Sequence, residues 1–313
     1  MEERESLLRE GLDRRGLLRC AAWAGAGLIW SVRGGLLSSR AFGQDNAPKA
    51  ADFTFVQISD THFGFNKEPN TDPTVTVKEA IKKINALPAA PAFVLHTGDV
   101  THLAKPAQFD QAAEILKGIK ANVLYVPGEH DTEGDDTKAF RERYGKDTKG
   151  LGWRSFDHQG VHFVGLVNVV NLKANGLGYL GKEQLDWLKA DLKPQGDSTP
   201  VVVYAHMPLW TIEDKWGWGT DDSAEALKEL KRFGSVTVLN GHIHQIMQKV
   251  EGNVTFHTAR SLAFPQGKPG EAKGPGPLKN VAADKLRTFL GASKVEFVAK
   301  KSALAITDPS LAE

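Results

Sequence analysis

Cysteine is almost absent from this chain, which has 313 residues and a single Cys at position 20. Cys20 lies in an N-terminal segment that we expect to be removed, so the mature protein should contain no disulfide and no thiolate metal ligand. This composition excludes the thiolate zinc-finger and thiol redox classes.

A surplus of charge of one sign is also missing. Lys and Arg total 39 against 38 Asp and Glu, which gives a formal net charge of +1. A chain without a basic stripe has no field with which to collect a polyanion, so no nucleic acid partner is expected. An anionic ligand must be captured locally.

The chain has one continuous apolar run near its start, at residues 20–32, and it is followed directly by Arg33. The run is shorter than the roughly 20 residues that span a bilayer, so no stable membrane anchor is expected. Arg14 and Arg15 precede it, and the segment resembles a twin-arginine export signal. We therefore expect a signal peptide over residues 1–43, recognition by the twin-arginine export machinery, and a periplasmic or secreted protein.

The rest of the chain, residues 44–313, is expected to form a single domain. Short β-branched runs alternate with amphipathic stretches, a pattern typical of a layered α/β domain. Helices are predicted at 74–87, 107–119 and 182–192. Strands are predicted at 53–59, 92–96, 123–126, 162–167, 201–205 and 236–240. Residues 264–278 are expected to form a loop, and 295–305 a closing hairpin.

Side chains that can bind metals follow five of these strands within about three residues. In chain order they are Asp60 and His62, then Asp99, then Glu129, His130 and Asp131, then His206, and finally His242 and His244. Loops at the carboxyl ends of strands in an open α/β sheet converge on one crevice. A single Asp after Gly or a single turn histidine would mean little, but the combination indicates a shared metal site.

The five motifs, Asp60-x-His62, Gly98-Asp99, Gly128-x-His130-Asp131, His206 and Gly241-His242-x-His244, resemble those of the calcineurin-like metallophosphoesterases. They occur in the family's order over roughly residues 53–260. Trp153-Arg154-Ser155-Phe156 and residues 184–188 are similar to the cyclic-nucleotide phosphodiesterase branch. The resemblance implies a four-layer α/β/β/α sandwich of two mixed sheets. It also implies metal-dependent hydrolysis of a small phosphomonoester or phosphodiester.

The resemblance further implies a role for each residue. Asp60, His62 and His244 would hold one metal, Asp99 would bridge, and His206 and His242 would hold the second. His130, steadied by Asp131, would donate to the phosphate or the leaving oxygen. The two metal ions, expected to be Fe, Mn or Zn, would bind the phosphoryl oxygens and activate a hydroxide between them.

Glu129 departs from the family pattern, which has Asn at this position as a neutral ligand. An added negative charge lowers the pull of the centre on an anionic phosphate. Four hypotheses follow: Glu129 compensates a trivalent metal, turns away and leaves a weak second site, acts as a base, or simply remains a ligand. The alternative function is a non-catalytic metal or anion-binding sensor or carrier, in which Glu129 impairs hydrolysis.

Other candidates carry less weight. His96 and His102 are expected to be packing or surface residues, although His102 has the alternative of approaching the phosphate. Trp210, Trp216 and Trp218 form either a packing cluster or an aromatic lid over the site.

Overall fold

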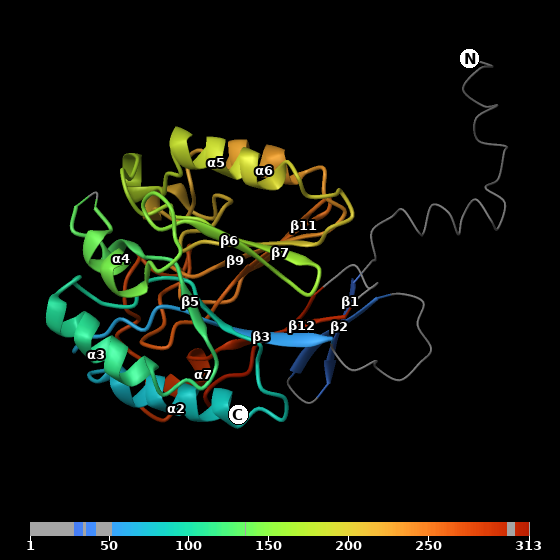
Figure 1. The fold of residues 1–313 in the computed structure, drawn as a ribbon. Helices are drawn as coiled ribbons and strands as arrows, with labels where there is room; N and C mark the ends of the chain where they lie inside the picture. Colours follow the sequence, from blue (N-terminus) through green and yellow to red (C-terminus); the bar gives the residue numbers. More distant parts are fainter. Residues whose placement is uncertain (1–27, 34–35, 42–51, 135, 299–303, 313) are drawn as a thin grey trace, which may run out of the picture. The chain divides into compact units, whose positions relative to one another are not determined.

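The structure is a computed structural model that describes residues 28–33, 36–41, 52–134, 136–298 and 304–312 (Figure 1). The chain divides into two compact units, residues 1–49 and 50–313. In the first unit, strands β1 (Leu28–Arg33) and β2 (Leu36–Ala41) pair in antiparallel fashion. Arg14, Arg15 and the end of the predicted signal peptide at residues 42–43 lie outside the described residues, so the signal and its boundary stay predictions.

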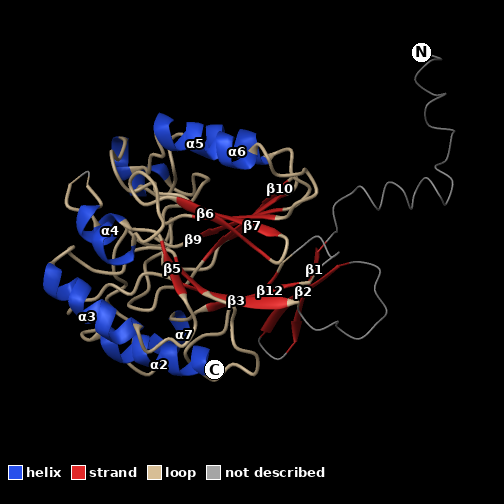
Figure 2. Ribbon diagram, viewed as in Figure 1, coloured by secondary structure: helices blue, strands red, loops and turns tan. Residues whose placement is uncertain are grey.

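Two mixed sheets form the centre of the second unit (Figure 2). The six-stranded sheet has the order β10-β11-β9-β8-β7-β6, and the five-stranded sheet has the order β13-β12-β3-β4-β5. The first contains β6 (Arg154–His158), β7 (Val161–Gly165), β8 (Val201–Tyr204), β9 (Val236–Asn240), β10 (Gln248–Glu251) and β11 (Val254–Thr258). The second contains β3 (Phe53–Ile58), β4 (Val94–His96), β5 (Val123–Tyr125), β12 (Ser293–Phe297) and β13 (Ala305–Thr307).

The strands that precede the predicted site residues run parallel to one another within each sheet. β3, β4 and β5 are parallel in the five-stranded sheet, and β8 and β9 are parallel in the six-stranded sheet. Their carboxyl ends therefore share an edge in each sheet, which is where the loops with Asp and His begin.

The helices agree with the periodicity of the sequence. They are α2 (Pro73–Asn85), α3 (Pro106–Leu116), α4 (Lys138–Tyr144), α5 (Lys182–Leu192), α6 (Ser223–Leu230) and α7 (Leu286–Phe289). Proline opens both α2 and α3, where its missing N–H costs no hydrogen bond. The three helices predicted from the sequence are confirmed, with ends that differ by up to three residues.

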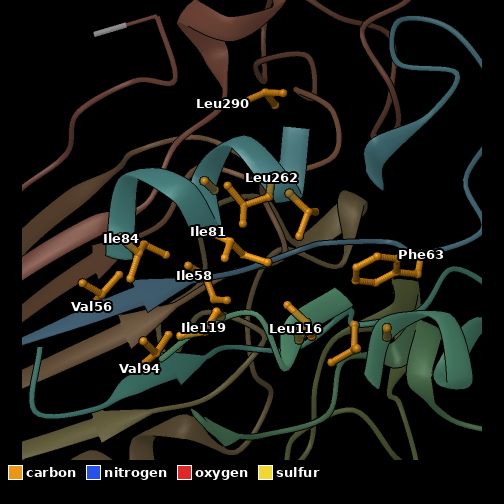
Figure 3. Close-up of a cluster of buried hydrophobic side chains, with 14 of the residues drawn as sticks. Val56, Ile58, Phe63, Ile81, Ile84, Val94, Leu116, Ile119, Leu262 and Leu290 are labelled. Carbon is orange, nitrogen blue, oxygen red and sulfur yellow. The ribbon is translucent and has the colours of Figure 1, made fainter. Parts of the chain in front are cut away.

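Alternation along the strands divides the core into layers. In β3, Val56 and Ile58 face α2 and α3 in the cluster that Figure 3 shows, whereas Phe53 and Phe55 face the other sheet. In β8, Val202 and Tyr204 join the same inter-sheet cluster, while Val201 and Val203 pack with residues of α5 and α6. The predicted α/β/β/α sandwich is therefore confirmed.

The remaining predictions concern the C-terminal part. β12 pairs antiparallel with both β13 and β3, which confirms the predicted hairpin and attaches it to the five-stranded sheet. Residues 264–278 form no helix or strand, as expected. Within the described ranges, no helix has both the length and the apolarity needed to cross a membrane.

Candidate metal centre

One group of ligand-type side chains gathers from the loops after β3, β4 and β9. It consists of Asp60, His62, Asp99 and His244, all buried, with ligand atoms within 4.8 Å of one another. His244 Nε2 lies 3.2 Å from His62 Nε2 and 3.3 Å from Asp60 Oδ1. Two carboxylates and two imidazoles thus face one small volume, a donor set suited to borderline or hard cations.

A second group lies beside the first and consists of Glu129, His206 and His242. Glu129 Oε2 lies 2.8 Å from His206 Nε2, and Glu129 Oε1 lies 2.9 Å from His242 Nδ1. The hypothesis that Glu129 turns away is therefore wrong, because its carboxylate occupies the space between the two histidines.

Asp99 connects the two groups. Its Oδ2 atom is 3.4 Å from His62 Nε2 of the first group and 3.4 Å from His206 Nε2 of the second. Its Oδ1 atom accepts a hydrogen bond of 3.0 Å from the backbone N–H of His130, which holds the carboxylate in this orientation. Asp99 therefore lies between the two ligand groups, within reach of a histidine from each.

Several polar atoms of the centre are buried and lie close to one another, yet they form no hydrogen bond among the described residues. They are Asp60 Oδ2, Glu129 Oε2, His206 Nε2 and both ring nitrogens of His242. Each such atom costs about 1–3 kcal/mol when it is left unsatisfied. Lone pairs that converge in this way are satisfied by cations, so the residues present fit a pair of metal ions.

The backbone of the centre is held in an unusual conformation. Asp60, His62, Asp99, His242 and His244 all have positive φ values, between 41° and 69°. Residues other than glycine rarely adopt this region, at a cost of about 1–3 kcal/mol each, and such strain concentrates at functional sites. The surrounding loops therefore determine where these side chains point.

Two glycines make the close packing possible. A Cβ atom at Gly128 would lie 2.0 Å from Asp99 Oδ1, and one at Gly241 would lie 2.0 Å from Ser59 Oγ. Neither position leaves room for a side chain, so each Gly allows a neighbouring strand end to approach the centre.

Hydrogen bonds at the far side of two rings fix their tautomers. His206 Nδ1 donates to Thr97 O at 2.7 Å, and His244 Nδ1 donates to Phe264 O at 2.6 Å. Because a carbonyl can only accept, both rings carry a proton on Nδ1 and can present an Nε2 lone pair to the centre.

The electrostatics of the centre favour bound cations. Burial alone would raise the pKa of Glu129, but attraction to His242 and His206 outweighs it and holds this pKa well below the ordinary range. Burial lowers the pKa of His206, yet Asp99 and Glu129 outweigh that effect and raise it well above the ordinary value. The carboxylates that favour a proton on His206 equally favour a metal cation in its place.

Asp131 has a different contact from the one predicted. Its carboxylate accepts hydrogen bonds from the backbone N–H groups of Val100, Thr101 and Gly128, at 2.7–3.0 Å. The ring of His130 is held instead through Nδ1, which lies 2.8 Å from the carbonyl oxygen of His102. The prediction that Asp131 steadies His130 is therefore wrong. Asp131 connects the loops after β4 and β5, and the carbonyl group of His102 holds the ring of His130.

His102 lies closer to the ligand groups than the sequence analysis predicted. Its Nδ1 atom lies 3.3 Å from His62 Nδ1, and its ring stacks on that of His130 with centroids 5.0 Å apart. Burial, with a further contribution from His130, lowers the pKa of His102 to about 4. In the sequence, the only sign of this role is its position three residues after Asp99, and that spacing does not reveal the ring contacts.

The other candidates lie away from the centre or serve packing. His96 is buried, its Nε2 lies 3.1 Å from Thr61 Oγ1, and burial lowers its pKa to about 3. Trp210 packs on Phe256, and Trp216 packs edge-on against Trp218. Packing contacts are thus found for all three tryptophans, and the alternative of an aromatic lid stays a prediction.

The comparison with known proteins now defines the class. A model of the calcineurin-like phosphoesterases matches residues 53–246, which is more than half of the chain and includes both ligand groups. The chain belongs to the calcineurin-like phosphoesterase family of metal-dependent hydrolases.

Relatives with assigned activities are distant. A probable cyclic nucleotide phosphodiesterase of Rhodopseudomonas palustris is 24% identical over 216 residues, covering 67% of this chain and 78% of that protein. A glycerophosphodiester phosphodiesterase of Enterobacter lignolyticus is 24% identical over 211 residues, covering 65% and 75%. The predicted likeness to cyclic-nucleotide phosphodiesterases is supported at this level.

Among solved structures, a dimetal phosphatase from Danio rerio has a TM-score of 0.64 at 11% identity, with coverage of 83% of this chain and 97% of that chain. A purple acid phosphatase from yellow lupin has a TM-score of 0.61 at 13% identity and covers 89% and 57%. At these identities the likeness concerns the fold.

Proposed function

We propose that this protein hydrolyses small phosphate esters at a centre of two cations. The observation that carries the proposal is the position of Asp99, whose Oδ2 atom lies equally far from a histidine of each ligand group. Two bound cations would supply positive charge to the phosphoryl oxygens and lower the pKa of an attacking water. Asp60, His62, Asp99 and His244 would hold one, and Asp99, Glu129, His206 and His242 the other.

His130 is assigned the proton transfer to the leaving oxygen. Its ring is only partly buried, and because Nδ1 donates to the carbonyl of His102, Nε2 is the nitrogen left to exchange a proton with a substrate. The backbone N–H of His130 meanwhile holds Asp99. One residue thus links the orientation of the shared ligand to the proton donor.

A phosphodiester is the first substrate class to test, because the relatives named above are a glycerophosphodiester phosphodiesterase and a protein named as a probable cyclic nucleotide phosphodiesterase. We further propose that the protein acts outside the cytoplasm, on the basis of its N-terminal sequence alone.

The proposed function is tested by turnover of bis(p-nitrophenyl) phosphate and p-nitrophenyl phosphate by protein loaded with Mn²⁺, Zn²⁺ or Fe. Asp99→Asn should lower activity by at least about 100-fold and reduce the number of tightly bound cations. Asp186→Asn is the matched control, since Asp186 is an exposed carboxylate paired with Lys182 on α5.

A second function has one observation in its favour. Glu129 places an extra negative charge between His206 and His242. This charge weakens the attraction of the centre for phosphate and would impair hydrolysis, which suits a non-catalytic sensor or carrier. Fully metallated protein that turns over neither ester would support this alternative.

A further inference from the structure

His62 differs from His244, the other histidine of the first ligand group, in how its outer nitrogen, Nδ1, is held. His244 Nδ1 donates to a backbone carbonyl, which can only accept a hydrogen bond. His62 Nδ1 instead lies 3.3 Å from the Nδ1 atom of another side chain, His102. Its inner nitrogen, Nε2, faces Asp99 Oδ2 and His244 Nε2.

Only one arrangement of this contact is compatible with a cation bound at the Nε2 atom of His62. For His62 Nε2 to offer a lone pair to a cation, the proton of the neutral ring must be on Nδ1. That proton then points at His102 Nδ1, which must accept it. The ring of His102 therefore accepts the Nδ1 proton of His62, as a main-chain carbonyl accepts the Nδ1 proton of His244.

The backbone and the ring of His102 are both held in place by neighbouring residues. Its backbone N–H donates to Phe63 O at 3.0 Å, its ring stacks on His130, and Phe65 packs edge-on against it at 5.2 Å. The paired loops after β3 and β4, bridged at Phe63 and Thr101, bring the two histidines together.

We propose that His102 is a positioning residue that sets the tautomer of His62 and so the strength with which the first ligand group holds its cation. The inference rests on the proposed two-cation centre. His102 acts on His130 through its carbonyl oxygen, so replacing its side chain leaves that hydrogen bond available. The ring and the carbonyl of one residue thus serve two different site histidines.

Two variants separate hydrogen bonding from packing. His102→Asn keeps an acceptor near the position of Nδ1 but removes the ring, whereas His102→Phe keeps a ring to stack on His130 but removes the acceptor. Binding of Zn²⁺ and Mn²⁺ to the metal-free full chain would be measured by calorimetry. His244→Ala and His242→Ala assign the two binding steps to the first and second groups.

His102→Phe should weaken the first-group step by about 10- to 100-fold, the range typical for loss of a hydrogen bond that orients a ligand. His102→Asn should stay within about threefold of the unmodified protein, and the second-group step should change little in either variant. An Asn variant that binds no more tightly than the Phe variant would overturn the inference. If the unmodified protein binds no cation, both the proposed function and this inference are wrong. If the protein shows two binding steps but the Asn and Phe variants bind the first cation equally weakly, only this inference is wrong.

Discussion

The Oε2 atom of Glu129 lies 2.8 Å from the Nε2 atom of His206, at the position where the family pattern has a neutral Asn. The side chain is turned into the centre, so of the hypotheses raised by the sequence, those in which Glu129 faces the metals remain. Its negative charge should then govern both cation affinity and anion affinity, in opposite directions.

We predict that Glu129→Gln weakens binding of the second cation by at least tenfold. The substitution keeps the length of the side chain but removes its negative charge. The attraction between two unit charges 4 Å apart is worth about 4 kcal/mol at an effective dielectric near 20. At saturating metal, the same variant should bind inorganic phosphate more tightly. Calorimetry of both ligands provides the measurement.

Glu129→Asn shortens the side chain and tests the family residue directly. Two divalent ions held equally tightly by the unmodified protein and both variants would show that the charge of Glu129 has no role in binding.

Gly128 should not tolerate a side chain. In Gly128→Ala the added methyl would meet Asp99 at both its Oδ1 atom and its backbone nitrogen, 2.0 and 2.3 Å away. We expect a loss of about 1–3 kcal/mol in the free energy of unfolding and weaker binding of both cations. Urea unfolding and metal titration test the two effects separately.

The matched control is Gly274→Ala, where an added Cβ meets nothing within 4 Å. If Gly128→Ala behaves like this control, the proposed close approach of Gly128 to Asp99 is wrong.

His162, which belongs to neither ligand group, should make the stability of the fold depend on pH. Its ring nitrogens lie 2.7 Å from Asp157 Oδ1 and 2.9 Å from Asp191 Oδ2. Burial alone would lower the pKa of His162, but the hydrogen bonds to Asp191 and Asp157 outweigh it and raise the pKa above 6.5. The stabilisation is then complete below pH 6.5 and is lost as the pH rises through the folded-state pKa.

Replacing His162 with Gln should therefore lower the free energy of unfolding by about 1–3 kcal/mol at pH 6. The loss at pH 9 should be smaller. Urea unfolding at both values measures this difference, and Asp186→Asn provides a surface control. Equal costs at pH 6 and pH 9 would contradict a charged His162 in the folded protein.

The twin-arginine pair gives a prediction about location. Replacing Arg14 and Arg15 together by Lys keeps the charge but removes the paired guanidinium groups that such a signal requires. The unprocessed chain should then accumulate in the cytoplasm. Fractionation of cells that produce either form tests this, and processing that continues unchanged would argue against the signal.

Much of the fold could be predicted because it depends on local periodicity. The helix at 182–192 was predicted residue for residue, since Leu185, Leu188 and Leu192 recur on one face. The strand alternation that separates Val56 from Phe55 is equally visible in the sequence. The hairpin of β12 and β13 was predicted, but its attachment to β3 joins residues more than 200 positions apart and has no local signal.

The sequence by itself determined which side chains stand at the ends of the strands, and with that the class of chemistry, because strand ends in such sheets meet at one edge. Only the tertiary structure decided where those side chains point: Glu129 inward, Asp131 onto backbone amides, and His102 onto His62. The physical reason is that rotamers, left-handed backbone angles and histidine tautomers depend on hydrogen-bond partners supplied by distant loops, which residue spacing does not encode.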